Sequence, residues 1–151
     1  MMNGLLRFDE DNACEVKDVG GLLYVVEMAG LTIAHFGHIG QNELTQDQLD
    51  ALGDIDIAIT QLANSYSRMG IENKKGFHLM DQVRPRLIIP TRSDMETVEH
   101  AVARWESYYA DSPVNIARSD LSDGTRFLVM GDGTDSSLGL AYKGIFSLPD
   151  W

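Results

Sequence analysis

A strand–turn–helix–strand pattern at residues 31–60, followed by a related segment at residues 85–94, constrains the fold of this chain most strongly. The apolar segment LTIAHFG runs into a turn flanked by glycines, and a short helix and the segment IDIAIT follow. Isoleucine recurs at every second position of IDIAIT, which is typical of a β-strand. In open α/β sheets, ligands and metals bind where strands end. The pattern therefore predicts an α/β fold, with any chemistry at the strand ends.

The size and charge of the chain restrict the class of protein. Its 151 residues fit a single domain, 1–151, with one sizeable core. Acidic residues number 23 and basic residues 12, which gives a formal net charge of −11. Direct nucleic-acid binding is disfavoured, because phosphate backbones are bound by clustered Lys and Arg. One alternative is an acidic inhibitor of a basic, nucleic-acid-handling protein.

The sequence also limits the cellular setting that we expect. Its apolar runs fall short of the roughly 20 residues that span a bilayer. The N-terminal segment lacks the regions of a secretion signal. The single cysteine, Cys14, excludes an internal disulfide and a multi-cysteine zinc site. We therefore expect a cytoplasmic protein that does not contact membranes.

Local signals predict the elements of the first half of the chain. A first short strand and a second strand beginning near Cys14 precede LLYVVEMAG, which pairs with LTIAHFG as a hairpin. Thr45 precedes Gln48 by three residues, which fits a helix-starting capping box. Gly53 is suited to end that helix.

The second half is predicted from helical spacing and from apolar runs. A helix is expected over residues 71–83, and the strand RLIIP follows it. Ser93 or Asp94 begins a long helix that is predicted to run to Tyr109. The last third predicts three strands, in the segments VNIARS, TRFLVMG and LGLAYKG.

Three of these segments together resemble a known family. IAHFGHIG, LTQDQLDALGDIDIAIT and PRLIIPTRSD are similar to the C-terminal half of metallo-β-lactamase superfamily hydrolases, in particular the ascorbate-lactonase-like branch. The resemblance covers residues 20–95. It implies mixed β-sheet layers flanked by helices, as half of an αββα sandwich whose complete form binds two metals at one sheet edge.

The metal-ligand positions that the resemblance implies are replaced in this sequence. The family's bridging aspartate corresponds to His38, and the histidine that closes its site corresponds to Arg92. The family's His-x-His-x-Asp-His cluster is absent from the chain. The resemblance therefore implies a degenerate site without catalytic residues and without a bound metal or other cofactor.

This degenerate site is predicted to bind a partner or a small anion through residues at the strand ends, namely His38, Asn64, Ser65, Tyr66, Thr91 and Arg92. Two of these residues, His38 and Arg92, have a second possible role. His38 is either a hydrogen-bonded turn residue or a metal ligand together with Asp56 or Asp94. Arg92 either binds an anion or pairs with one of the same two acids, because an unpaired buried charge is costly.

Half of a sandwich leaves one sheet face uncovered, and the strands are apolar enough to require burial on both faces. We therefore expect a homodimer, or a second protein chain over that face. The leading hypothesis is a non-catalytic binding or structural protein that acts as an oligomer. The alternative is a subunit of a metal-dependent hydrolase, with zinc or manganese, whose missing ligands come from another chain.

Overall fold

The computed structural model describes residues 6–7, 13–20, 22–37, 39–64, 68–91, 93–111 and 114–131. Within these ranges the strands are β1 (Leu6–Arg7), β2 (Ala13–Gly20), β3 (Leu23–Met28), β4 (Leu31–Phe36), β5 (Ile57–Thr60), β6 (Leu87–Pro90), β7 (Glu106–Asp111) and β8 (Arg126–Gly131). The helices are α1 (Gln46–Leu52), α2 (Lys75–Val83), α3 (Met95–Arg104) and the 3-10 turn η2 (Arg118–Asp120). None of the helices in this part of the chain is long and apolar enough to cross a membrane.

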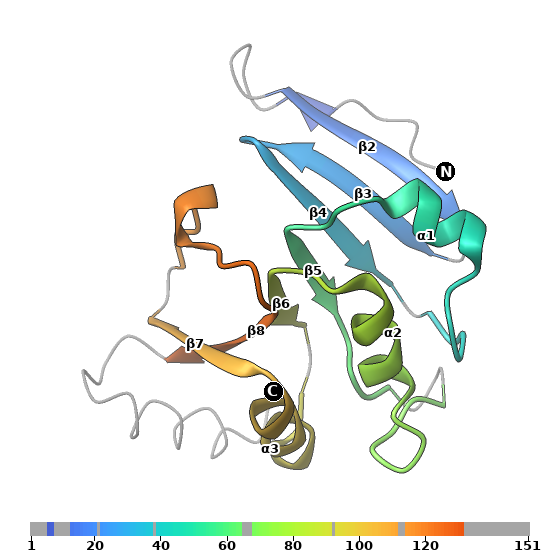
Figure 1. Cartoon of the computed structure of the whole chain (residues 1–151), viewed down its shortest axis with the longest axis vertical. Helices are drawn as coiled ribbons and strands as arrows, with labels where there is room; N and C mark the ends of the chain where they lie inside the picture. The colour runs from blue at the N-terminus through green and yellow to red at the C-terminus, as the bar shows by residue number, and fades with distance from the viewer. Residues whose placement is uncertain are drawn as a thin grey trace.

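The strands form one mixed sheet in the order β1-β2-β3-β4-β5-β6-β8-β7 (Figure 1). The first four strands pair antiparallel, whereas β4, β5, β6, β8 and β7 pair in parallel. Helices connect β4 to β5, β5 to β6 and β6 to β7, and the last of these connections passes over β8. The predicted α/β class with a mixed sheet flanked by helices is confirmed.

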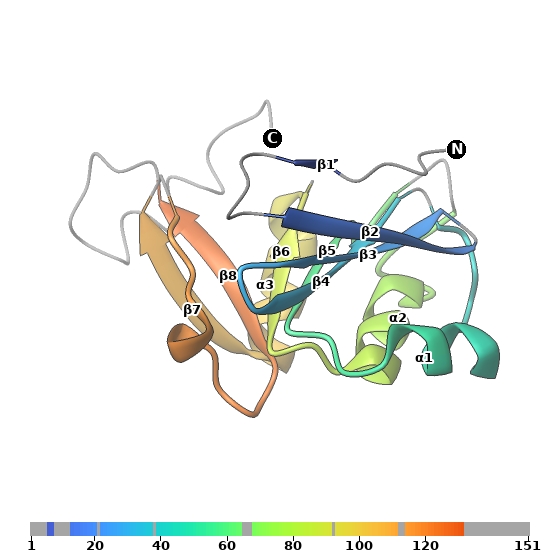
Figure 2. The same cartoon turned by 90° about the horizontal axis from the view of Figure 1, so that it is seen from above.

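All three α-helices cover the same face of the sheet (Figure 2). The larger core lies between that face and the helices, and its fully buried side chains include Phe36, Ile88 and Phe127. A smaller core on the opposite face is formed by Leu31, Ile57, Leu87 and Leu128, and Ile116 and Leu121 from the β7–β8 connection pack against it. The connection between β7 and β8 therefore covers part of the second face.

The predicted boundaries of α1 are confirmed at both ends. The side chain of Thr45 accepts a hydrogen bond from the Gln48 backbone N–H at 3.2 Å, and the Thr45 N–H donates to Gln48 Oε1 at 3.0 Å. Gly53 has φ 63°, which favours glycine, and its N–H donates to the Leu49 carbonyl at 3.1 Å. Local chemistry is sufficient to define this helix.

The predicted long helix ending at Tyr109 is wrong, because α3 ends at Arg104 and residues 106–111 form β7. Trp105 has extended backbone angles, and its ring stacks between Phe77 and Phe127 in the helix-side core. All six residues of β7 pair with β8. Residues 106–109, which were expected in the helix, therefore belong to a strand whose hydrogen bonds come from β8, later in the chain.

Two further boundaries differ from the predictions. Residues 71–73 form a turn, so α2 begins at Lys75, where Asn73 Oδ1 accepts from the Lys75 N–H at 3.1 Å. The segment VNIARS is no strand, because residues 114–117 lie in an extended connection that leads into η2. TRFLVMG is a strand as predicted, and LGLAYKG lies outside the described residues.

Replacing Gly76 with alanine should destabilise the fold, although the same change in most helices stabilises by up to about 1 kcal/mol. A Cβ at Gly76 would lie 2.6 Å from the carbonyl oxygen of Leu62 and 2.8 Å from its Cα. Because backbone atoms cannot move aside cheaply, we expect a loss of about 1–3 kcal/mol in urea unfolding. Gly124→Ala is the control, since its Cβ meets nothing within 4 Å. Equal losses of stability at the two positions would contradict the close approach of α2 to the backbone of Leu62.

Candidate functional site

The strand ends that were predicted to meet do lie at one edge of the sheet, here called the carboxyl edge, where β4, β5 and β6 end. Thr60 is the register partner of Pro90, and the N–H of Thr91 donates to the Thr60 carbonyl at 3.0 Å. Gly37 directly follows β4, and β4 is parallel to β5. The topology therefore brings the three predicted segments to the same side of the molecule.

Two of the six predicted site residues lie within the described ranges. Asn64 is half-buried, and its backbone exchanges two hydrogen bonds of 2.9 Å with Met69 across the loop after β5. Thr91 is exposed directly after β6. The other four predicted site residues, His38, Ser65, Tyr66 and Arg92, lie outside the described residues, so their roles stay predictions.

Sequence reasoning missed a set of buried polar atoms close to the carboxyl edge. Gln61 Oε1, Ser93 Oγ and Thr97 Oγ1 are buried without a hydrogen-bond partner among the described residues. Ser93 lines a hollow of about 40 Å³, which is room for about one water molecule. Asp94, the other candidate cap, begins α3 by accepting from the Thr97 N–H at 2.8 Å. One signal for this site was present in the sequence, which offered two candidate caps, and only one of them, Asp94, is needed to begin α3. The side chain of Ser93 is therefore available for another contact.

Asp56 lies at the opposite end of β5 and β6 from these residues. The sequence offered it as a partner of Arg92 or as a metal ligand with His38, and both of those residues lie outside the described residues. Asp56 immediately precedes β5, and its carbonyl accepts hydrogen bonds from the N–H groups that lead into β6. Its side chain is only 3% exposed. Because β5 and β6 run in parallel, Asp56 marks the amino edge of the strands, whereas Thr91 marks the carboxyl edge.

Protein donors engage both carboxylate oxygens of Asp56. Oδ1 accepts from Arg86 Nη1 at 3.1 Å, and Oδ2 accepts from Arg118 Nη1 at 3.0 Å and from the Thr32 N–H at 2.9 Å. Arg118 Nη1 also lies 3.1 Å from the carbonyl oxygen of Gly30. Among the described residues, the arginine partners of Asp56 are Arg86 and Arg118, and the cluster ties the β7–β8 connection to the β3–β4 hairpin.

The same cluster affects the titration of Arg86. A hydrogen bond from Arg86 Nη2 to Asp54 at 3.1 Å is the largest cause of a raised Arg86 pKa, and the nearby charges of Asp54 and Asp56 add to it against the opposing effect of burial. Arg86 therefore remains positively charged throughout the physiological range. A buried acid held by permanent cations and a backbone N–H is suited to a structural role.

A metal site requires several ligand side chains close together. Within the ranges that the structure describes, no three or more His, Cys, Asp and Glu side chains are grouped so that they could hold a metal ion. The sequence offered three candidate ligands. Asp56 contacts arginines, Asp94 caps α3, and His38 lies outside these ranges.

The mixed sheet with helices on one face defines a metallo-β-lactamase-like fold. A family model described as a β-lactamase superfamily domain matches residues 6–92, which is more than half of the chain. The chain therefore belongs to the β-lactamase superfamily. The ascorbate-lactonase-like branch stays a prediction.

A solved structure supports the same fold. It is that of a proposed zinc-dependent hydrolase of the metallo-β-lactamase superfamily from Thermotoga maritima, with a TM-score of 0.61 and 17% sequence identity. The alignment covers 86% of the present chain and 70% of that protein. At this identity the likeness establishes the fold alone. No curated protein matches the sequence.

Proposed function

We propose that the chain is a non-catalytic binding or structural member of the superfamily, which assembles through the sheet face opposite the helices. The observation that carries the proposal is a set of half-buried apolar side chains on that face. This set, here called the apolar face, consists of Tyr24, Val26, Met28, Ile33, Ile59, Ile89, Tyr108, Ala110 and Met130.

The strand register makes the apolar face continuous. Val26 is the register partner of Ile33 across β3 and β4, and Ile59 is the partner of Ile89 across β5 and β6. Ala110 is the partner of Met130 across β7 and β8. Residues directly opposite one another in neighbouring strands share a face, so these pairs extend over six strands. The β7–β8 connection covers part of this face, and the surface that stays accessible on these half-buried side chains is apolar. Contiguous exposed apolar surface marks sites of protein association.

The occupant that we propose for the apolar face is a second copy of the chain. A two-fold dimer would bring two identical apolar surfaces together, which is self-complementary. Each copy carries a net charge of −11, so the two copies repel one another electrostatically. Added salt screens that repulsion, so it should strengthen the dimer. Salt would instead weaken the binding of this acidic chain to a basic partner, because it screens the attraction between opposite charges.

The non-catalytic part of the proposal is supported by the sequence at two family positions. His38 occupies the position of the bridging aspartate, and Arg92 occupies that of the closing histidine. A guanidinium is permanently charged and repels a divalent cation. The residues at these positions therefore favour binding over metal-dependent hydrolysis.

Light scattering coupled to size-exclusion chromatography tests the assembly. We expect a mass of twice 16.7 kDa at micromolar concentration, and the mass of one chain for Ile59→Lys and for Val26→Lys. Using two positions on different strands guards against one variant that fails to fold, and circular dichroism monitors folding. The matched control is Met95→Lys, which changes a 48% exposed residue on the helix side and should leave the dimer intact. A monomeric native chain would contradict the proposal.

Metal analysis of the purified chain separates the proposal from the hydrolase alternative. We expect no zinc or manganese at stoichiometric amounts after purification in metal-supplemented medium. Stoichiometric metal that is lost in His38→Ala would instead support a metal-dependent hydrolase subunit.

A further inference from the structure

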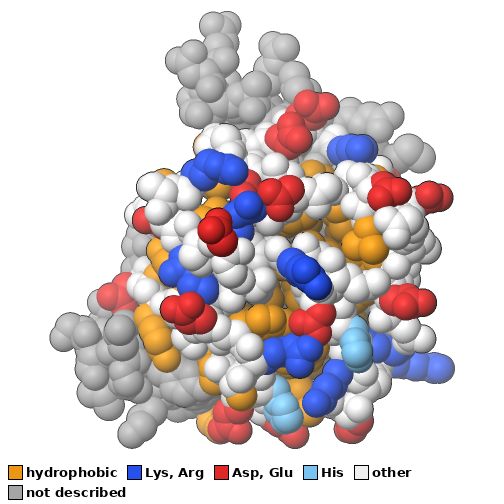
Figure 3. Space-filling model, in the orientation of Figure 1, with side chains coloured by type: hydrophobic (Ala, Val, Ile, Leu, Met, Phe, Trp, Pro, Cys, Tyr) orange, Lys and Arg blue, Asp and Glu red, His pale blue; other side chains and the backbone are white. Residues whose placement is uncertain are grey.

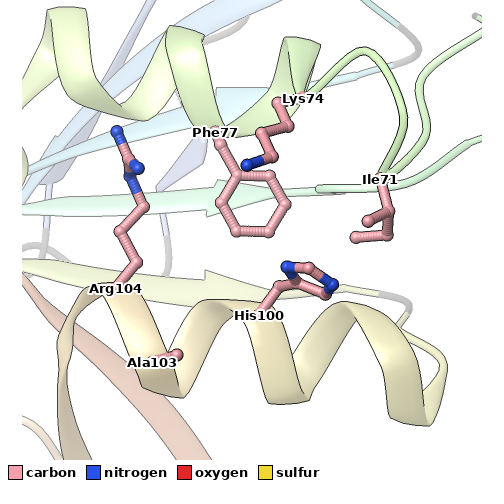
Figure 4. A pocket seen from close by; sticks show the side chains of 6 residues that line it. All are labelled: Ile71, Lys74, Phe77, His100, Ala103 and Arg104. Atoms are coloured by element: carbon pink, nitrogen blue, oxygen red, sulfur yellow. The ribbon is translucent and has the colours of Figure 1, made fainter.

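A hollow of about 230 Å³ lies between α2 and α3, on the side of the sheet opposite the apolar face. Its lining residues are Ile71, Lys74, Phe77, His100, Ala103 and Arg104 (Figure 4). Phe77 is 4% exposed and forms the floor. Its ring stacks on Trp105 at 5.4 Å between centroids, and Trp105 stacks in turn on Phe127 at 6.3 Å. The floor is therefore a rigid aromatic surface anchored in the core.

The walls of the hollow carry three basic side chains, although the whole chain has a net charge of −11. Figure 4 shows the Lys74 ammonium, from the residue before α2, directed toward the Phe77 ring, and the His100 imidazole facing it from α3. Lys, Arg and His side chains lie on the surface over these two helices, with Asp and Glu side chains among them (Figure 3). Basic side chains that converge from two elements repel one another unless an anion lies between them.

The three basic groups differ in their protein contacts. Arg104 donates to Asp81 through Nε at 3.2 Å and through Nη2, and this hydrogen bond raises the Arg104 pKa. Asp81 thereby neutralises the charge of Arg104 and fixes the position of its side chain at the edge of the hollow. Within the described part of the chain, the side chains of Lys74 and His100 have no hydrogen-bond or ion-pair partner. The donors that remain available are thus on Lys74 and His100.

We propose that this hollow binds a small organic carboxylate, with its charged group between Lys74 and His100 and its apolar part against Phe77 and Ile71. The amino end of α2, next to Lys74, adds partial positive charge that favours the same anion. A volume of about 230 Å³ is below the roughly 300–1,000 Å³ of drug-sized sites, so the ligand is small. The site is on the helix side and does not depend on assembly through the apolar face.

Titration by NMR with three probes tests the proposal on the full chain. We expect benzoate to shift the signals of Phe77 and His100 with a dissociation constant in the millimolar range. Benzyl alcohol, which has the same ring without the charge, should bind at least tenfold more weakly. Inorganic phosphate, which has the charge without the ring, should also bind at least tenfold more weakly. Equal binding of either comparison probe would overturn the proposal.

Matched variants on the same two helices test the assignment to residues. Lys74→Gln and His100→Gln should each weaken benzoate binding about tenfold. Lys75→Gln and His78→Gln remove the same groups at neighbouring positions that do not line the hollow, and they should leave binding unchanged. If the control variants lose as much affinity as the pocket variants, the attraction is general electrostatics and the proposed site is wrong.

Discussion

Replacing Asp56 with alanine should lower the free energy of unfolding by about 3 kcal/mol, which urea denaturation followed by circular dichroism would measure. The change removes a carboxylate that is 3% exposed and leaves the Thr32 N–H without its acceptor. Arg86 and Arg118 lose their buried acceptor and keep Asp54 and the Gly30 carbonyl, respectively, as partners. Breaking a buried ion pair costs about 3–5 kcal/mol. We expect the lower end of that range, because the side chains of Arg86 and Arg118 are 23% and 61% exposed and can be partly solvated.

Asp54→Ala provides the control for this prediction. Asp54 contacts the same arginine, Arg86, at 3.1 Å, but its side chain is 78% exposed. Surface ion pairs contribute at most about 1 kcal/mol, so the loss should stay below that value. The difference between the two aspartates isolates the effect of burial. Losses of the same size for both variants would show that the Asp56 cluster does not hold the β7–β8 connection in place.

Replacing Phe127 with alanine should cost about 3–5 kcal/mol, as is typical of a fully buried aromatic side chain. Phe127 has no exposed surface, and its ring stacks against Trp105 at 6.3 Å with an angle of 17° between the planes. The substitution would leave a cavity where β8 meets α3. Urea unfolding followed by tryptophan fluorescence reports on the neighbouring Trp105 as well as on stability.

Tyr109→Ala is the matched comparison for Phe127→Ala. Tyr109 is also an aromatic residue in a paired strand, one strand away at the edge of the sheet, but it is 43% exposed. Its removal should cost no more than about 1 kcal/mol. A comparable loss at both positions would mean that the second half of the sheet is not packed around Phe127 as described.

The candidate site was predictable only in part. Pairing of β4, β5 and β6 in parallel places their carboxyl ends at one edge, as the order of strands and helices in the sequence implied. The buried polar atoms of Gln61, Ser93 and Thr97 were not predicted, because burial of a short polar side chain depends on what packs over it. The hollow beside Phe77 was missed for a similar reason, since its walls come from two helices separated by β6.

The sequence by itself determined the features that depend on neighbours within a few residues. The capping box of Thr45 and Gln48 and the end of α1 at Gly53 arise from hydrogen bonds over three or four residues, so their spacing predicts them. The β3–β4 hairpin through Ala29 and Gly30 is of the same kind.

Only the tertiary structure decided the features that depend on distant partners. Residues 106–111 have apolar spacing compatible with a helix, and they form β7 because β8, about twenty residues later, supplies the hydrogen bonds. Asp56 pairs with Arg86 and Arg118, which lie 30 and 62 residues further along the chain. No local pattern specifies such pairs, because which charges meet is set by the order of the strands and not by the spacing of the residues.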